Sequence, residues 1–352
     1  MEREKRKNEH LHYAVQLEQN FYNSGLDEIH LVPDSLPELN LEEIDLTTSL
    51  GELQLKYPII INAITGGTSE AKKINYFLAQ TANICELPIA VGSQTAALDN
   101  EGLTETFEIV RKVHPQGLVF ANVGAYISVD RAKRAVEMLE ADALQIHLNV
   151  PQELAMTEGD RNFRGYLENI YLIKKELNIP IIVKEVGFGL SRESIKKLKE
   201  IGVSLIDIGG KGGTNFIAIE KAREKISLER EVFLNWGLPT AVSLLESLEE
   251  LGSKGQIIAS GGITNGLELA KVLALGAQAA GIAGLFLKTL VLHGEKALIA
   301  KTEEIKRQLR ITMLMVGAKS ISALQRKPLV ILGNTAEWLK QRDIDIKKYA
   351  RR

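Results

Sequence analysis

The sequence contains a single cysteine, Cys85, among its 352 residues. One cysteine can form neither a disulfide within the chain nor a cysteine metal cluster, and such scarcity is typical of a reducing compartment. The chain also has little excess of either charge, because 43 Lys and Arg residues stand against 45 Asp and Glu residues, for a formal net charge of -2. This balance indicates neither nucleic acid nor an anionic membrane surface as a partner.

Long apolar runs are missing as well. The apolar stretch from Gly281 to Leu292 is interrupted by Lys288 and is too short to span a bilayer. The N-terminal sequence MEREKRKNEH has no apolar core of the kind that secretory signal peptides carry. We therefore expect a cytoplasmic protein without a membrane segment.

The sequence does contain a repeated alternation of short apolar runs with longer amphipathic segments. The eight apolar runs are YPIIINA, LPIAVGS, GLVFANVG, DALQIHLN, PIIVKEV, VSLIDIGG, QIIASGG and AQAAGIAG. Runs without polar alternation are typical of parallel strands buried on both faces. The segments between them, such as Ser191 to Ile201 and Leu267 to Leu275, space their charged residues for one solvent-facing side. Eight strand–helix units predict an α/β fold, a (β/α)8 TIM barrel, as one domain over residues 1–352.

A ninth run, EVFLNWGLPT from Glu231 to Thr240, also has the composition of a strand. We assign it to an insertion after strand six, because the runs that end at Gly262 and Gly284 then become strands seven and eight, where barrels usually hold a phosphate. The first 50 residues are polar, and we expect an irregular N-terminal segment. It would comprise a flap and a stretch, residues 31–51, that crosses the base of the barrel.

Polar residues and glycines gather at the carboxyl ends of the predicted strands. They are Thr65-Gly66-Gly67, Ser93-Gln94-Thr95, Asn122-Val123-Gly124, His147-Leu148-Asn149, Lys184, Gly209-Gly210, Ser260-Gly261-Gly262 and Ala283-Gly284. In a barrel these ends share one rim, and active sites lie there. Glycines alone could simply turn the chain at a strand end. The recurrence of Ser, Thr, Asn, Gln, His and Lys beside them favours a binding site.

Two glycine-rich segments at neighbouring strand ends predict a phosphate site. In the segment from Ala259 to Gly284 a strand ends in Gly-Gly, a helix follows, and the next strand ends in Ala-Gly. The loop from Gly209 to Phe216 adds more amides and the hydroxyl of Thr214. Glycines let backbone N–H groups approach phosphate oxygens, and the N-terminus of a helix favours an anion.

Lys184 stands inside the apolar run IIVKEV. A buried lysine is costly unless it is paired. We therefore expect Lys184 to project into the rim, beside an electron-rich ring or an anion. The alternative is a lysine that points outward and snorkels between the helices.

A second group of polar residues follows the fourth strand. His147 and Asn149 are two residues apart, so both face the same side of the strand, and Gln152 and Glu153 follow in the loop. A single carboxylate suits Mg2+, which accepts one carboxylate together with substrate phosphate and water. The alternative is a surface glutamate that caps the next helix.

The N-terminal sequence RKNEHLH carries a cluster of basic side chains, Arg6, Lys7, His10 and His12. Such a tail is either simply solvated or forms a flap that brings cations to a diphosphate.

Together these residues resemble the type 2, flavin-dependent isopentenyl-diphosphate isomerases. The matching pieces run from residue 6 to about residue 284 in the family's order: RKNEH, NAITGG, VGSQTAAL, FANVGA, QIHLNVPQE, VKEVGFG, DIGGKGGTNF, NWGLPT, ASGGITNG and GIAG. The joined pair QIHLN-x-x-QE and VKEVGFG is specific, whereas many flavin barrels share the glycine motifs. Thr264 departs from the pattern, since related sequences often have Arg there, which leaves the local phosphate contact open.

The resemblance implies an enzyme of isoprenoid biosynthesis that interconverts isopentenyl and dimethylallyl diphosphate by proton transfer at reduced FMN. It also implies Mg2+, NADPH to keep the flavin reduced, and a homo-oligomer, a tetramer or octamer. The implied substrate contacts are Arg6, Lys7, His10, Ser93, Gln94, Thr95 and Gln152, with His147 and Asn149 in support and Glu153 as the ligand of Mg2+. The implied FMN contacts are Ala63, Ile64, Thr65, Ser93, Asn122, Lys184, Thr214, Gly261, Gly262, Ala283 and Gly284.

The residues themselves agree with chemistry carried by a cofactor. No pair of ordinary side chains at the rim stands out as acid and base, and Cys85, in the sequence TANICELP, has the context of a core residue. An electron-rich reduced flavin can supply the proton and stabilise the cation that protonation of an alkene creates.

Three other functions remain as alternatives. A redox flavin barrel such as a 2-hydroxy-acid oxidase needs a His and Arg pair near Gly261, and the sequence has none there. A barrel of the inosine-phosphate dehydrogenase type needs a nucleophilic cysteine in a rim loop, which Cys85 does not provide. A phosphate-binding scaffold would not account for Lys184 together with the Gln-Glu loop.

Overall fold

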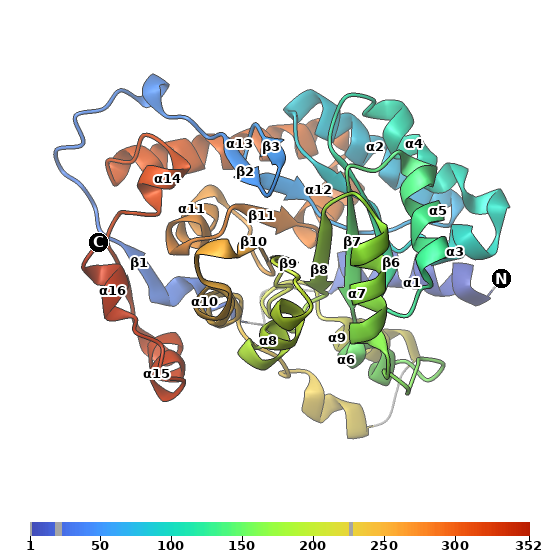
Figure 1. The fold of residues 1–352 in the computed structure, drawn as a ribbon. Coiled ribbons are helices and arrows are strands. Elements are labelled where there is room, and N and C mark those ends of the chain that lie inside the picture. Colours follow the sequence, from blue (N-terminus) through green and yellow to red (C-terminus); the bar gives the residue numbers. More distant parts are fainter. Residues whose placement is uncertain (1, 18–22, 225–227) are drawn as a thin grey trace.

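The computed structural model describes residues 2–17, 23–224 and 228–352. Eight parallel strands close into a barrel, and β11 pairs with β4 to complete it (Figure 1). In chain order they are β4 (Ile59–Ile61), β5 (Ile89–Ala90), β6 (Val119–Gly124), β7 (Ala143–Leu148), β8 (Ile181–Glu185), β9 (Leu205–Asp207), β10 (Gln256–Ser260) and β11 (Ala279–Ile282). Each of the eight predicted runs forms one of these strands, which confirms the predicted (β/α)8 barrel.

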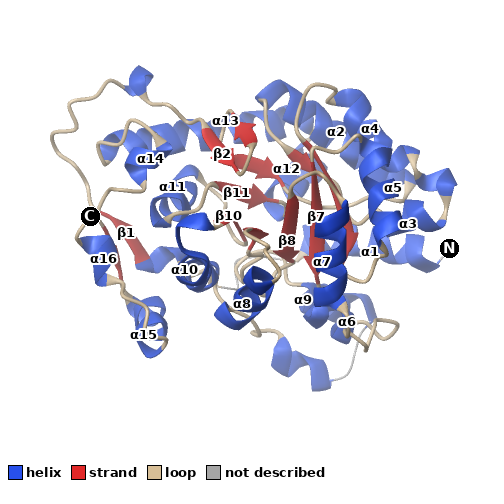
Figure 2. Ribbon diagram, viewed as in Figure 1, coloured by secondary structure: helices blue, strands red, loops and turns tan. Residues whose placement is uncertain are grey.

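Helices surround the barrel (Figure 2). The longer ones are α2 (Ser69–Cys85), α4 (Glu105–Val113), α5 (Val129–Leu139), α7 (Tyr166–Glu176), α8 (Arg192–Glu200), α9 (Phe216–Glu224), α10 (Thr240–Leu251), α11 (Gly266–Leu275), α12 (Gly284–His293) and α13 (Glu295–Met315). Short elements between the strands are α3 (Thr95–Asp99), η4 (Glu101–Leu103), α6 (Val150–Ala155), η5 (Leu228–Phe233) and η6 (Gly252–Lys254). Among the described residues, no helix combines the length and the apolarity that crossing a membrane requires.

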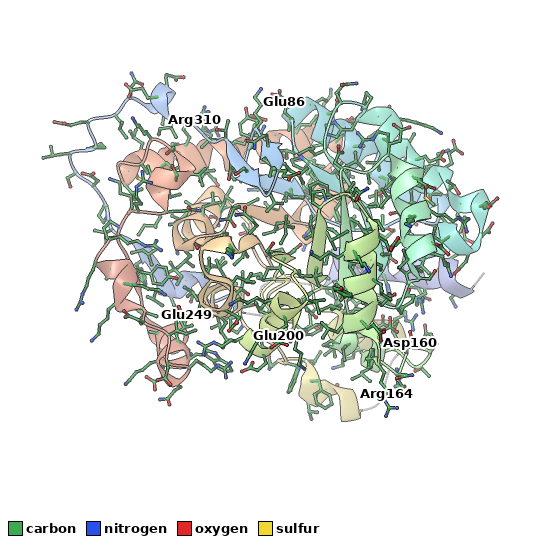
Figure 3. The ribbon with its side chains drawn as sticks, in the orientation of Figure 1. Glu86, Asp160, Arg164, Glu200, Glu249 and Arg310 are labelled. Atoms are coloured by element: carbon green, nitrogen blue, oxygen red, sulfur yellow. The ribbon has the colours of Figure 1, made fainter. Side chains whose placement is uncertain are left out.

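Local sequence explains where the predicted helices begin. The Ser191 hydroxyl accepts a hydrogen bond from the Ser194 amide at the start of α8, and the Asn265 side chain accepts one from the Glu268 amide at the start of α11. Both residues are favourable N-caps because their oxygens satisfy amides that have no partner within the helix. Charged side chains such as Glu86, Glu200 and Glu249 lie on the outside of the molecule (Figure 3).

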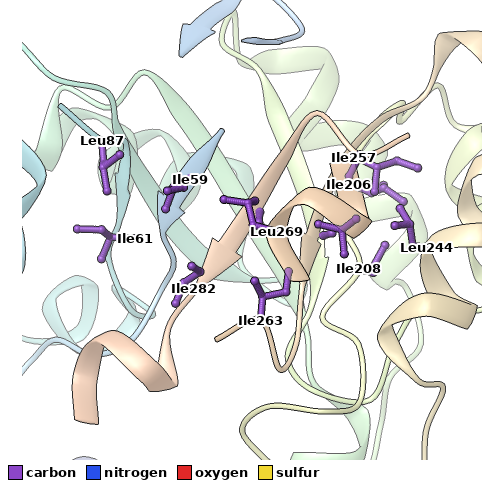
Figure 4. Close-up of a cluster of buried hydrophobic side chains, with 14 of the residues drawn as sticks. Ile59, Ile61, Leu87, Ile206, Ile208, Leu244, Ile257, Ile263, Leu269 and Ile282 are labelled. Carbon is purple, nitrogen blue, oxygen red and sulfur yellow. The ribbon is translucent and has the colours of Figure 1, made fainter. Parts of the chain in front are cut away.

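The hydrophobic core has two layers, which follow from the alternation of side chains along each strand. Between the strands and the helices, Ile59 and Ile206 belong to one cluster with Leu244 of α10 and Leu269 of α11 (Figure 4). Inside the barrel, the intervening residues form a second cluster at its base. Its members are Leu50, Leu55, Ile60, Ala90, Phe120, Ala143, Ile182, Leu205, Ile258 and Ala279.

The base of the barrel is closed by a hairpin of β2 (Thr48–Leu50) and β3 (Leu53–Leu55). Leu50 and Leu55 pack against the inward side chains of the barrel strands, so this stretch crosses the base as predicted. Before the hairpin, residues 32–47 contain only the one-turn helix η3 (Leu41–Glu43), as expected of an irregular segment.

Two further groups of elements lie outside the barrel. The one-turn helix η2 (Leu26–Glu28) leads into β1 (Ile29–Leu31), which pairs antiparallel with β12 (Leu329–Ile331). The C-terminal helices are α14 (Ile321–Leu324), α15 (Gly333–Gln341) and α16 (Lys347–Ala350).

The run EVFLNWGLPT forms no barrel strand. It follows β9 and α9, begins within η5, and makes a single parallel bridge between Lys211 and Pro239 before α10 starts. The predicted insertion after strand six is thus confirmed.

The expectation of an irregular start to the chain is wrong for Glu2–Gln16, which form the helix α1. Its sequence is strongly polar, so it carries little of the hydrophobic periodicity by which helices are recognised. Leu11 is nevertheless buried in the main core cluster, and Lys5 and Glu9 form an i,i+4 ion pair. Docking on the core through Leu11 and the partly buried Ala14 and Val15, together with several polar contacts, therefore supports this helix.

Candidate active site

One cavity of about 290 Å3 lies at the carboxyl ends of the barrel strands, and residues of α1 contribute to its wall. It collects nearly all of the site residues expected from the sequence. They are Arg6, Lys7, His10, Ala63, Ile64, Thr65, Ser93, Thr95, Asn122, His147, Asn149, Gln152, Glu153, Lys184, Thr214, Gly261, Gly262, Ala283 and Gly284. Residues from all eight strand ends and from the N-terminus thus meet at one place.

Gln94 is the exception. Its side chain is fully buried, donates from Nε2 to the Ala135 carbonyl at 2.8 Å and accepts at Oε1 from the Asn122 amide at 2.9 Å. It does not line the cavity, so the expectation that it contacts substrate is corrected. Its neighbours Ser93 and Thr95 do line the cavity, and their hydroxyl oxygens lie 3.0 Å apart.

One end of the cavity is built from main chain. Gly262 has a φ of +74°, and a Cβ there would stand 2.4 Å from the Gly212 carbonyl oxygen. A Cβ at Gly213 would likewise stand 2.8 Å from the Gly262 nitrogen. The two glycine-rich loops therefore pack backbone against backbone, with no room for side chains. The ten-residue helix α12 begins beside them at Gly284. Such an arrangement of amides and a helix N-terminus suits a phosphate group.

Lys184 enters the cavity from β8. Its side chain is 7 % exposed, Nζ donates to the Glu185 carbonyl at 2.9 Å, and Asp207 Oδ2 lies 3.9 Å away. The lysine thus points inward and does not snorkel between the helices. It places a positive charge in the cavity wall, balanced by the fully buried carboxylate of Asp207.

Glu153 lies in α6, at the cavity wall. Its Oε1 accepts from Asn149 Nδ2 at 2.8 Å, and its Oε2 accepts from the Asp160 amide at 2.9 Å. Each oxygen keeps a lone pair that could face a cation. Among the described residues no group of three His, Cys, Asp or Glu side chains is placed to hold a metal. A cation at Glu153 would therefore take its other ligands from substrate and water, which is a donor set that Mg2+ accepts.

Basic side chains of α1 lie at the mouth of the cavity, and each has a protein partner. Lys7 Nζ donates to the carbonyls of Gly66 and Ser93, which belong to two strand-end loops. Arg6 forms an ion pair with Glu158 at 3.3 Å. His10 Nε2 lies 2.6 Å from Glu220 Oε1, a fully buried carboxylate. These contacts hold α1 over the cavity in one orientation.

The surroundings of His147 strongly shift the pKa of its imidazole. Burial, together with the positive charges of Lys184 and Lys7, lowers the pKa of its imidazole from 6.5 to about 3. The ring is therefore neutral near pH 7, and its Nδ1 lies 2.8 Å from Asn122 Oδ1. Between about pH 3 and pH 7 it therefore carries no positive charge and can accept or donate hydrogen bonds.

This depressed pKa predicts a specific loss of stability in acid. A histidine whose pKa is lower in the folded state stabilises the fold above its unfolded pKa, and that contribution disappears as the pH falls from about 6.5 towards about 3. We expect the urea midpoint of His147→Gln to fall less steeply than that of the parent over this range. His12→Gln, at an exposed position of α1, should follow the parent. Parallel curves for the parent and His147→Gln would contradict the assignment.

Three buried polar residues that belong to this site were not selected from the sequence. Asn62, Gln145 and Asp207 lie in or directly after barrel strands, and all three are at most 4 % exposed. A signal existed for one of them, since Gln145 interrupts an apolar run two residues before His147 and so shares its face of the strand.

Comparisons with known proteins agree with this geometry. A family model described as FMN-dependent dehydrogenase matches residues 131–331. Among solved structures, a mandelate oxidase variant with benzaldehyde superimposes with a TM-score of 0.66 at 16% identity, covering 88% of each chain. A mandelate oxidase variant with the monooxide FMN adduct gives a TM-score of 0.64 at 15% identity, covering 88% of this chain and 90% of that one. At such identities the likeness concerns the fold.

Sequence relatives are much closer. A protein named isopentenyl-diphosphate delta-isomerase from Geobacillus sp. (strain WCH70) is 49% identical over 99% of both chains. Proteins of the same name from Bacillus licheniformis and Bacillus pumilus are 48% and 46% identical, over 100% and 99% of this chain and 100% and 98% of theirs. With the flavin-type barrel and the cavity described above, this chain belongs to the FMN-dependent, type 2 family of isopentenyl-diphosphate delta-isomerases.

Proposed function

We propose that this enzyme interconverts isopentenyl diphosphate and dimethylallyl diphosphate in the barrel cavity, with reduced FMN bound there. The main support is a single cavity with two kinds of wall. Main chain at Gly261 and Gly262 forms a cradle for a phosphate, and the charged side chains of Arg6, Lys7 and Glu153 line another part of the wall. Two anionic groups, the phosphate of a cofactor and the diphosphate of a substrate, would thus have separate places.

The residues fit FMN along the length of the cavity. The phosphate would lie against Gly261, Gly262, Ala283, Gly284 and Thr214, where the close backbone approach leaves amides accessible. The ring would lie against the strand ends, which contribute Ala63, Ile64, Thr65, Ser93, Asn122 and Lys184. When bound and reduced, the cofactor supplies an electron-rich ring that can donate a proton to the alkene and stabilise the resulting positive charge.

The chain's own side chains would bind and orient the substrate. Arg6, Lys7 and His10 offer positive charge or N–H donors to the diphosphate, and Gln152 lies beside Glu153 on the same wall. Glu153 would hold Mg2+ against the diphosphate oxygens. NADPH would keep the flavin reduced, and the protein would act in the cytoplasm as a homo-oligomer, a tetramer or octamer.

The alternatives that need a reactive cysteine or a His and Arg pair find no support in the described residues. Burial raises the pKa of the Cys85 thiol to about 11, and this cysteine lies in α2 outside the cavity wall. Thiolate chemistry of the dehydrogenase type is therefore not available at this position. The strand end at Gly261 is followed by Gly262, Ile263 and Thr264, with no His and Arg pair for a 2-hydroxy acid. Membership of a dehydrogenase-like flavin family thus concerns the cofactor and the fold.

We expect the purified protein to be yellow and to release FMN, and not FAD, on denaturation. The main-chain cradle is sized for one phosphate, and no dinucleotide fingerprint follows the first strand. Gly262→Ala should raise the Kd for FMN by about tenfold or more, because a Cβ would collide with the Gly212 carbonyl. Gly102→Ala, at an exposed turn with ordinary φ, is the control that should bind normally. Chromatography that finds FAD, or no flavin after reconstitution, would refute the proposal.

A further inference from the structure

A continuous row of polar side chains, all buried except the partly buried His147, crosses the inside of the barrel, and Asn62, Asn122 and His147 of this row also line the cavity. Asn62 Nδ2 lies 2.6 Å from Asp207 Oδ2, and Gln145 Nε2 lies 3.0 Å from Asn62 Oδ1. Asn122 Nδ2 lies 3.1 Å from Gln145 Oε1, and its Oδ1 lies 2.8 Å from Nδ1 of His147. The row thus links a carboxylate on β9 to an imidazole on β7 through three primary amides.

The direction of every hydrogen bond in this row follows from its first member. A carboxylate only accepts hydrogen bonds, so Asn62 must present its NH2 group to Asp207. Its oxygen then faces Gln145, which must donate to it, and the oxygen of Gln145 in turn accepts from Asn122. The oxygen of Asn122 is left for His147, so the imidazole must donate through an Nδ1–H.

Further contacts hold the first amide in this orientation. Asn62 Oδ1 also accepts from the Ala63 amide at 2.9 Å, which the NH2 group could not do. Asp207 accepts from the Ser260 hydroxyl and the Gly209 amide at its other oxygen, and the cationic Lys184 Nζ lies 3.9 Å away, so these neighbours are donors and leave it the role of an acceptor. A reversed row would set an amide oxygen against a carboxylate.

The packing of the barrel reserves space for the row. A Cβ at Gly281, on β11, would stand 2.4 Å from Asn62 Nδ2. Glycine at this position lets the Asn62 side chain lie flat across the neighbouring strand and reach Asp207. Gln145 and Asp207 are fully buried, and neither lines the cavity. Whatever they contribute to the site, they contribute through other side chains.

We propose that Asp207, acting through Asn62, Gln145 and Asn122, fixes His147 as the Nδ1–H tautomer, so that Nε2 presents a lone pair to the cavity. Asp207 and Gln145 are positioning residues in this scheme. Asn122 by itself would not select a tautomer of His147, because an Asn side chain can rotate to offer its oxygen or its NH2 group. The acceptor-only carboxylate at the far end removes this freedom.

The fixed acceptor suggests which ligand group it serves, and this step rests on the proposed function. An ionised diphosphate and an alkene carry no N–H or O–H donor, whereas the ring of reduced FMN carries N–H groups. A neutral Nε2 acceptor therefore suits a ring N–H of the flavin and not the substrate. If His147 instead presented an N–H at Nε2, two hydrogen-bond donors would face each other and neither would have an acceptor.

The tautomer can be measured directly by 15N NMR of protein labelled at its six histidines, since protonated and unprotonated imidazole nitrogens resonate far apart. The His147 signals are assigned by their absence in His147→Gln. In the parent we expect Nδ1 protonated and Nε2 unprotonated, whether or not flavin is bound. Nε2–H in the parent would overturn the proposal at once, even if no variant of the row folded.

Two substitutions at Gln145 separate polarity from packing. Gln145→Met keeps the volume but removes the link, so Asn122 becomes free to rotate, and we expect the Nδ1–H tautomer to be lost or mixed. Gln145→Glu should restore it, because a carboxyl oxygen still accepts from Asn122 in either protonation state. A packing role alone would favour Met over Glu. Equal tautomers in the Met variant and the parent, or loss in the Glu variant too, would overturn the proposal.

Gln94→Met provides the matched control. Gln94 is an equally buried amide, but its side chain contacts Asn122 at the backbone N–H and not at the side chain, so the His147 tautomer should not change. For the isomerase reaction we expect Gln145→Met to lower kcat by about tenfold or more, because a wrong histidine tautomer strongly lowers kcat in other enzymes. The KM should change by less than about threefold. The NMR result is independent of turnover. A protein without isomerase activity but with the expected tautomers would refute the proposed function and not the row.

Discussion

Glu153→Gln is expected to isomerise isopentenyl diphosphate about two orders of magnitude more slowly than the parent at ordinary Mg2+ concentrations. Glu153 lines the same cavity as the basic residues of α1, and both of its oxygens accept hydrogen bonds, one from Asn149 and one from the Asp160 amide. Gln keeps the shape and removes the charge, so Mg2+ would lose its protein ligand. The diphosphate would then be held less firmly, and such positioning can be worth several kcal/mol of barrier.

The measurement is the isomerase rate as a function of Mg2+ concentration for both proteins. Extra Mg2+ should restore part of the rate in Glu153→Gln, because the diphosphate remains a ligand. FMN content and reduction by NADPH should not change, since the glycine cradle lies elsewhere in the cavity. Glu168→Gln, at an exposed position of α7, serves as the control. If the curves of isomerase rate against Mg2+ concentration overlay for all three proteins, Glu153 does not bind the metal and only orders α6 and the turn after it.

The barrel was predictable because its strands are buried on both faces. Runs such as PIIVKEV carry no polar alternation, and each forms a parallel strand whose polar residues come at the carboxyl end. The same property predicted where most of the site residues lie, because the carboxyl ends of barrel strands share one rim. The run EVFLNWGLPT has strand-like composition, but only its position relative to the two glycine-rich strand ends indicated that it is an insertion.

Side-chain direction at the strand ends was less predictable. Ser93, Gln94 and Thr95 are consecutive, yet Gln94 turns away from the cavity into contact with Ala135. Beyond the last strand residue the period of two no longer applies, so sequence cannot tell which neighbour faces the ligand. The row from Asp207 to His147 was out of reach for another reason. It joins four strands, and its contacts depend on the register between them.

The helix α1 was missed because its contacts with the barrel are mostly polar. Its three anchors are Arg6 to Glu158, Lys7 to two carbonyls, and His10 to Glu220, and each partner lies 59 or more residues away in the sequence. Such polar pairs produce no hydrophobic periodicity within the sequence of the helix itself. The basic residues expected on a flap or a solvated tail therefore lie on a helix and have defined partners on the barrel.

Lys7→Met is expected to raise the KM for isopentenyl diphosphate by about 10- to 100-fold, as the loss of a hydrogen bond to a charged group costs about 1.5–3 kcal/mol. Lys7 is held at two strand ends, because its Nζ donates to the carbonyls of Gly66 and Ser93. Arg6 is partly neutralised by Glu158, so the substrate would have to compete for it. We therefore expect a smaller rise in KM for Arg6→Met than for Lys7→Met.

Lys5→Met tests whether this effect belongs to the site or to the helix. Lys5 precedes these residues in α1, but its side chain is 77% exposed and pairs with Glu9 along the same helix. Its loss should alter KM by less than about twofold, since exposed i,i+4 pairs contribute little. FMN affinity should be equal in all three variants, because the cradle is formed by other loops. If Lys7→Met and Lys5→Met behave alike, α1 merely covers the cavity, and the diphosphate must be bound by the opposite wall.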